Sequence, residues 1–119
     1  MDTPEKALRL VDSVPGLTIT LDYTHFAKTG IPDSVVEPLI RRASHFHARS
    51  AKLGALQTTL SENSIDYSRI IEVMKQTGYC GFIGIEYIWT EWENCNRCDN
   101  VSESVQLMRL MKEAEQSYA

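Results

Sequence analysis

Three side chains of the kinds that bind metal ions occur along the sequence, each at the end of a short strand-like run. They are Asp22, His47 and Glu86. Two carboxylates and one imidazole form a mixed oxygen and nitrogen set, which suits Mn²⁺, Mg²⁺, Co²⁺ or Zn²⁺ better than an ion that prefers thiolates. Each residue also has an ordinary explanation, because aspartates cap turns and histidines or glutamates often end strands without binding a ligand. Spacing alone therefore leaves open both a shared metal site and three unrelated strand ends.

A second histidine lies two residues before the candidate ligand His47. Residues two apart in a strand point to the same face, so His45 and His47 are expected to present their imidazoles together. If that face lines the interior of a barrel, both rings lie where a ligand could bind.

The elements that must position these residues follow from the apolar pattern. Strands are expected at residues 17–21, 43–48 and 81–85. Helices are expected after a Thr3 cap, from an Asp33 cap through Ile40 with a kink or break at Pro38, from a Ser64 or Asp66 cap to Gly78, and over residues 101–115. This alternation predicts an α/β fold of parallel strands joined by right-handed crossovers. The polar residues would then gather at the C-terminal ends of the strands, where such proteins build their sites.

The pattern leaves two architectures open, a small open sheet and a part of an eight-stranded barrel. A doubly wound sheet usually carries a glycine-rich phosphate loop after an early strand, and the sequence has none. A complete barrel typically needs about 250 residues. The chain has 119 residues, which fit one domain.

Composition sets limits on the partners and the location of the chain. Apolar residues make up 43% and charged residues 24%, as in soluble globular proteins. The net charge of −4 gives no reason to expect a nucleic-acid partner, and no apolar run approaches the roughly 20 residues of a membrane span. Three cysteines cannot all pair within one chain, so we expect a reducing, cytoplasmic location. Cys95 and Cys98 have the spacing of a zinc or redox pair, but structural zinc needs four ligands, so an ordinary loop is preferred.

Three segments together resemble the C-terminal part of the xylose isomerase-like barrel superfamily, which includes sugar-phosphate isomerases, ketose epimerases and apurinic-site endonucleases. The segments are Leu-Asp-Tyr-Thr-His at 21–25, His-Phe-His at 45–47 and Gly-Tyr-Cys-Gly-Phe-Ile-Gly-Ile-Glu at 78–86. The resemblance implies a partial (β/α)8 TIM barrel, in which residues 1–119 form the last three strands with their flanking helices. The acidic charge and the presence of only three histidines disfavour the endonuclease branch, which uses a histidine-rich multi-zinc site.

The resemblance also implies roles for individual residues. The metal ligands would be Asp22, His47 and Glu86. Glu86 also corresponds to one of two glutamates that move a proton between carbons, while the metal polarises a carbonyl and a neighbouring hydroxyl. His25 corresponds to a residue that contacts a substrate hydroxyl. Arg49 and Gln57 follow the ligand histidine and are candidates for binding a substrate oxygen or phosphate.

One departure from the family concerns the second glutamate of that pair, whose strand should lie upstream of Thr3. We therefore expect an isomerase or epimerase of carbohydrate metabolism, acting on a small sugar, sugar phosphate or cyclitol, whose site is incomplete in this chain. Another copy in a homo-oligomer, or a complementary N-terminal half, would complete it. The alternative is a non-catalytic, truncated barrel fragment that binds a metal or a complementary chain.

Overall fold

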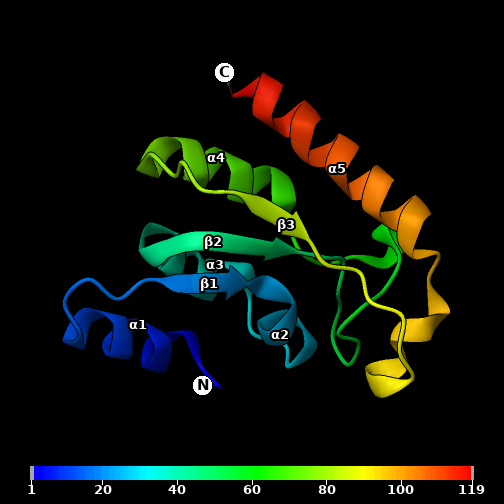
Figure 1. The fold of residues 1–119 in the computed structure, drawn as a ribbon, viewed down its shortest axis with the longest axis horizontal. Coiled ribbons are helices and arrows are strands. Elements are labelled where there is room, and N and C mark those ends of the chain that lie inside the picture. Colours follow the sequence, from blue (N-terminus) through cyan, green and yellow to red (C-terminus); the bar gives the residue numbers. More distant parts are fainter. Residues whose placement is uncertain (1, 119) are drawn as a thin grey trace.

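The computed structural model describes residues 2–118 as three parallel strands with helices between them (Figure 1). The strands are β1 (Ile19–Asp22), β2 (Ala43–Ala48) and β3 (Ile83–Ile85), side by side in that order. The α-helices are α1 (Pro4–Ser13), α2 (Tyr23–Lys28), α3 (Asp33–Val36), α4 (Tyr67–Thr77) and α5 (Asn100–Ser117). Three 3-10 helices complete the set, η1 (Glu37–Arg42), η2 (Leu60–Glu62) and η3 (Trp92–Arg97). Both strand pairings are parallel, which confirms the expected crossovers.

The strand expected at residues 43–48 is confirmed, whereas the other two begin two residues later than expected. Ile19 pairs with Ala43, which is the first residue of β2, so residues before Ile19 have no partner on that strand. The third strand, β3, starts at Ile83, which pairs with Phe46 in the middle of β2. Apolar composition thus predicted both strands, and the start of β2 explains the later start of β1 alone.

Helix ends follow the expected capping residues in two of three cases. The Thr3 side chain accepts a hydrogen bond from the third residue of α1. Asp66, and not Ser64, caps α4, because its carboxylate accepts from a backbone N–H in the first turn. Gly78 ends α4 with a φ of 74°, in the left-handed region where glycine avoids the steric cost of a Cβ atom.

The expected Asp33 cap is wrong. Asp33 is the first residue of α3, and Pro32 before it takes the N-cap position with an extended backbone. The Asp33 carboxylate is used elsewhere, because it accepts a hydrogen bond from the backbone N–H of Asp66 at 2.8 Å. The expected break at Pro38 is confirmed, since α3 ends at Val36 and the chain continues as the 3-10 helix η1.

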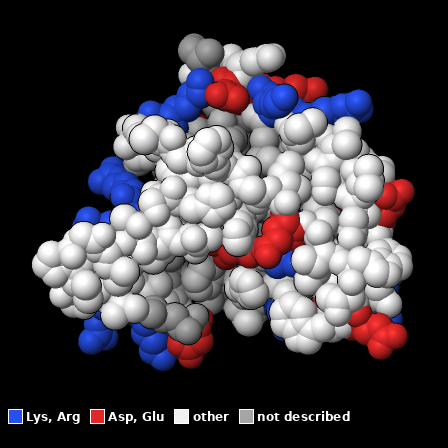
Figure 2. All heavy atoms as spheres, in the orientation of Figure 1, with Lys and Arg blue, Asp and Glu red and all other residues white. Residues whose placement is uncertain are grey.

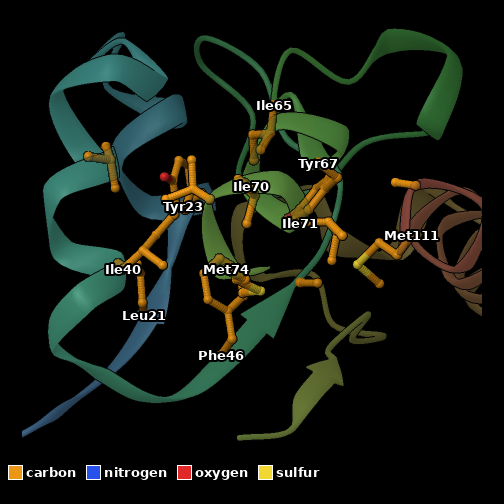
Figure 3. Packing of buried hydrophobic residues seen from close by; sticks show 14 of the residues in the cluster. Leu21, Tyr23, Ile40, Phe46, Ile65, Tyr67, Ile70, Ile71, Met74 and Met111 are labelled. Atoms are coloured by element: carbon orange, nitrogen blue, oxygen red, sulfur yellow. The ribbon is translucent and has the colours of Figure 1, made fainter. Parts of the chain in front are cut away.

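Helices bury one face of the sheet. Leu21 of β1 and Phe46 of β2 are 2% and 0% exposed, and they belong to one core cluster with Ile70 and Met74 of α4 (Figure 3). Met111 of α5 extends this cluster beyond α4. Because successive side chains of a strand point to opposite faces, burial of this face turns the neighbouring residues to the other face.

The opposite face of the sheet is partly open and carries the polar residues of the strands. His45 and His47 are both half-buried there, with their rings edge to face and their centroids 5.1 Å apart. The expectation that the two imidazoles share a face is therefore confirmed. Within residues 2–118, β1 and β3 each pair with one strand and leave one edge free. Among these residues no helix combines the length and the apolarity that a membrane span requires.

Candidate metal centre

The three candidate ligands come together at the C-terminal ends of three neighbouring strands. Asp22 ends β1, His47 lies in β2, and Glu86 directly follows β3. One potential ligand atom from each lies within 4.8 Å of the other two. His47 Nδ1 is 3.0 Å from Glu86 Oε2. Sequence spacing had left open three unrelated strand ends, and the structure instead brings these side chains to one point.

Strand register explains this convergence. Asp22 is the direct partner of His47 across the β1–β2 pair, so parallel pairing places their side chains side by side on one face. Glu86 continues β3, and its backbone N–H donates to the carbonyl of Ala48 at 2.9 Å. That bond holds Glu86 level with the end of β2.

The donor set fits a divalent cation. Two bonds of about 2.1 Å to one ion place their ligand atoms no more than about 4.2 Å apart. The observed separations of up to 4.8 Å therefore need a closure of less than about 1 Å. The Asp22 side chain is 12% exposed, while those of His47 and Glu86 are 35% and 43% exposed. This leaves one side of the group open, as a catalytic metal site requires.

The space-filling view agrees with this arrangement. Acidic atoms gather in a small hollow near the centre of the face in Figure 2, over the C-terminal ends of the strands seen in Figure 1. Most other charged side chains in this view lie around the margin of the molecule. The hollow is therefore a local concentration of acidic atoms, with basic atoms directly beside it, and carboxylates gathered in this way attract a cation.

Asp22 has contacts that the sequence did not reveal. Its Oδ1 accepts hydrogen bonds from both the backbone N–H and the hydroxyl of Thr24, at 2.9 and 2.5 Å. The first of these bonds makes Asp22 the N-cap of α2. The ordinary explanation of Asp22 as a cap and its interpretation as a candidate ligand are thus both seen in one side chain. Capping statistics could have pointed to the backbone bond, but no sequence signal marks the buried hydroxyl.

His25 lies at the rim of the candidate centre. Its Nε2 is 3.5 Å from Asp22 Oδ2, and its side chain is 59% exposed. An imidazole placed this way can donate to, or accept from, a group bound beside the three ligands. Its expected contact with a substrate hydroxyl stays a prediction that this position favours.

Arg49 and Gln57 are buried side chains and do not lie on the open surface of the site. Arg49 is 3% exposed, and its Nη2 donates to Thr24 Oγ1 at 3.2 Å. Gln57 is 5% exposed, and its amide bonds to both the carbonyl and the N–H of Ile88 and to the carbonyl of Cys95. Their expected contacts with substrate stay predictions that this burial does not favour. Both side chains instead hold the segments that surround the centre.

The loop after Glu86 is fixed at several points and presents two tryptophans to solvent. Trp89 and Trp92 are 70% and 57% exposed. Glu93 has a φ of 56° and pairs with Lys28 at the end of α2, with Nζ and Oε1 2.6 Å apart. Cys95 and Cys98 are buried free thiols in this loop, and burial raises the pKa of both. In the part of the chain that the structure describes, no metal-ligand group includes a cysteine.

Comparison with known proteins agrees with this architecture. The profile of the family described as the xylose isomerase-like TIM barrel matches residues 1–113. Among solved structures, that of an L-ribulose 3-epimerase superposes with a TM-score of 0.68 at 15% sequence identity. The match covers 99% of this chain and 43% of that chain, so the protein spans less than half of its structural neighbour. No curated protein sequence matches the chain significantly.

These matches decide the architecture that periodicity had left open. The three parallel strands with their helices are consecutive units of a partial (β/α)8 barrel, as the resemblance of the short segments implied. The partly open face that carries His45 and His47 corresponds to the interior of such a barrel. Since the family profile covers nearly the whole sequence, this chain belongs to the xylose isomerase-like TIM barrel family.

Proposed function

We propose that the chain forms the metal-binding half of an isomerase or epimerase that moves a proton on a small sugar, sugar phosphate or cyclitol. The observation that carries this proposal is the convergence of Asp22, His47 and Glu86 from three adjacent strands. Family membership supports the sugar isomerase and epimerase class, and a structural neighbour is an L-ribulose 3-epimerase.

The residues of the site suggest a division of work. Asp22, His47 and Glu86 would hold a divalent cation, such as Mn²⁺, Mg²⁺, Co²⁺ or Zn²⁺, that polarises a carbonyl oxygen and a neighbouring hydroxyl when bound. The more exposed carboxylate, Glu86, takes a proton from the carbon beside that carbonyl. His25, at the rim, holds a substrate hydroxyl and so orients the sugar.

A second acid or base must complete the proton transfer. Epimerisation removes a proton from one face of a carbon and returns one to the other, so it needs groups on both sides of the substrate. Glu86 is the one glutamate that residues 2–118 contribute to the candidate centre. We propose that another copy of the chain or a complementary N-terminal half supplies the second group.

A second candidate function is a non-catalytic barrel segment that binds a metal or a complementary chain. The observation in its favour is that the described residues supply three candidate ligands, of which a single one is a glutamate, and leave two strand edges free. Both candidate functions include the metal site, but the non-catalytic segment would not convert a sugar substrate.

Metal binding by the full chain is the first test. Calorimetric titration with Mn²⁺ should show one site, and Asp22→Ala should weaken it by more than about 10-fold through the loss of a ligand. Glu113→Gln, which changes an exposed carboxylate of α5, is the matched control and should bind like the wild type. Mn²⁺ binding that Asp22→Ala leaves unchanged would locate the ion elsewhere and contradict the proposed centre.

Proton transfer is tested by deuterium uptake. Small ketoses are incubated with the metal-loaded protein in D₂O, and mass spectrometry follows exchange at the carbon beside the carbonyl. Glu86→Gln should slow this exchange by about 10²–10⁴-fold, which is the usual contribution of a general base. Metal binding without exchange on any ketose would favour the non-catalytic candidate.

A further inference from the structure

We propose that Thr24 is a positioning residue that fixes the Asp22 carboxylate for metal binding, and that Arg49 fixes the orientation of the Thr24 hydroxyl. This inference rests on the metal centre proposed above and adds a residue that sequence patterns did not identify. It also gives Arg49 a role that its burial favours, in place of contact with substrate.

Thr24 holds one oxygen of Asp22 with two hydrogen bonds. Its backbone N–H and its hydroxyl both donate to Oδ1, at 2.9 and 2.5 Å. Thr24 is 0% exposed, so water does not compete for either bond. Two donors on one oxygen restrict rotation of the carboxylate. The other oxygen, Oδ2, is then the one that faces His25 at 3.5 Å and is available to a cation.

The guanidinium of Arg49 determines the direction of this network. Arg49 Nη2 lies 3.2 Å from Thr24 Oγ1 and 3.6 Å from Asp22 Oδ2. A guanidinium carries only donors, so the Thr24 hydroxyl must accept from Arg49. The hydroxyl proton is then left to point at Asp22, which fixes both its direction and the oxygen that receives it. The charge of Arg49 is buried, and among the described residues its ion-pair partner is Asp22.

Arg49 is itself held in place by α4. The hydroxyl of Tyr67, the first residue of α4, donates to the carbonyl of Arg49 at 2.6 Å and accepts from its N–H at 2.9 Å. Burial raises the pKa of Tyr67, so this hydroxyl keeps its proton at neutral pH. The position of Asp22 is thus determined by contacts that run from α4 through Arg49 and Thr24. Contacts of this kind around metal ligands typically change metal affinity by about 10–100-fold when they are removed.

Two isosteric or near-isosteric replacements test the role of Thr24 in the full chain. Thr24→Val keeps the shape but removes the hydroxyl, and it should weaken Mn²⁺ binding in calorimetric titration by about 10–100-fold. Thr24→Ser keeps the hydroxyl and should restore binding close to that of the wild type. Wild-type affinity in Thr24→Val would overturn the proposal, as would an equal loss of affinity in both variants.

A second pair of measurements distinguishes positioning of Asp22 by Thr24 from a purely structural role of Thr24. If Thr24 acts through Asp22, then adding Thr24→Val to Asp22→Ala should not reduce Mn²⁺ affinity further. An additional loss in the double variant would show that Thr24 acts by another route. If Thr24→Val fails to fold, as judged by thermal unfolding in EDTA, Thr24→Ser and Thr24→Ala replace it, because these two differ only in the hydroxyl. Equal Mn²⁺ affinities of these two would then overturn the proposal.

The outcome for Thr24 is distinguishable from the outcome for the centre. Absence of Mn²⁺ binding in the wild type would remove the metal site and the role of Thr24 with it. Wild-type binding that is insensitive to Thr24→Val would remove the positioning role alone and leave Asp22 as a ligand.

Discussion

Asp22 takes part in two structures at once. One of its oxygens caps helix α2 and accepts from Thr24, and the other faces the candidate metal centre beside His25. A carboxylate has room for several hydrogen bonds, so the two roles do not compete for the same oxygen. The cap fixes the side chain so that its second oxygen faces the candidate metal centre.

The cysteines should differ in reactivity according to their burial. Cys95 and Cys98 are buried and burial raises the pKa of both, whereas Cys80 is exposed. A raised thiol pKa lowers the fraction of reactive thiolate at neutral pH. Titration with a thiol reagent near pH 7.5 should therefore modify Cys80 rapidly and the other two slowly, with the slow phase accelerating as the pH rises.

A Cys80→Ser variant identifies the fast phase. It should lose the rapid reaction and keep the slow one. Rapid modification of two or three thiols in the native protein would show that the loop containing Cys95 and Cys98 opens readily, contrary to its buried packing.

For individual residues, the sequence predicted the candidate ligands that end strands. It could not predict the side chains that form hydrogen bonds to those ligands. Asp22 and Glu86 were identifiable because each follows an apolar run directly. Thr24 was not, because its importance depends on Arg49, which is 25 residues away along the chain. Arg49 was interpreted as a substrate contact because it follows the candidate ligand His47 and because of the family resemblance, and only the fold shows that it is buried.

Among the elements, the contact between α4 and the end of β2 does the most to shape the centre. The Tyr67 hydroxyl bonds to both backbone groups of Arg49, just after β2 ends, and Tyr67 is 2% exposed. This contact closes the loop between β2 and α4 and fixes the backbone of the residue that follows β2. The loop had no predicted element, because its order comes from such long-range bonds and not from periodicity.

Removing this hydroxyl should destabilise the fold. Tyr67→Phe leaves a buried N–H and a buried carbonyl of Arg49 without a partner, at a cost of about 1–3 kcal/mol in the free energy of unfolding. Urea denaturation measures this change. Tyr118→Phe alters an exposed tyrosine after α5 and should have little effect. Equal stabilities of the two variants would contradict a structural role for the Tyr67 hydroxyl.

Element types were predictable from the sequence, and element ends were less so. The helix from residue 67 to 77 has strong signals at both ends, in Asp66 and Gly78, and the structure confirms both. Asp33 carried an equally good capping signal, but its carboxylate bonds to the backbone of Asp66 instead. A cap depends on local geometry, and here a tertiary contact decided how the side chain was used.

For the whole molecule, the free edges of β1 and β3 are the most consequential feature. Unpaired strand edges expose backbone donors and acceptors that readily pair with another chain. Phe82, next to β3, is 84% exposed and adds apolar surface beside this edge strand.

We therefore expect the isolated chain to self-associate. Light scattering should give a mass above the 13.5 kDa of one chain, rising with concentration. Phe82→Glu places a charge beside the free edge and should shift the equilibrium toward monomer. Leu53→Glu changes another highly exposed apolar residue, 73% exposed and outside the sheet, and serves as the control. A monomer at all concentrations would contradict this expectation.

Because Asp22 both caps helix α2 and belongs to the candidate metal centre, the proposed binding of an ion there would also order the start of this helix. A ligand that binds only the conformation in which Asp22 faces the centre stabilises every contact that this conformation contains. The first turn of α2 is one of these contacts, since Asp22 caps it. Amide hydrogens at the start of α2 should therefore exchange with solvent more slowly when Mn²⁺ is present than in EDTA. The exchange rate at this helix end would then measure how much of the protein has bound an ion.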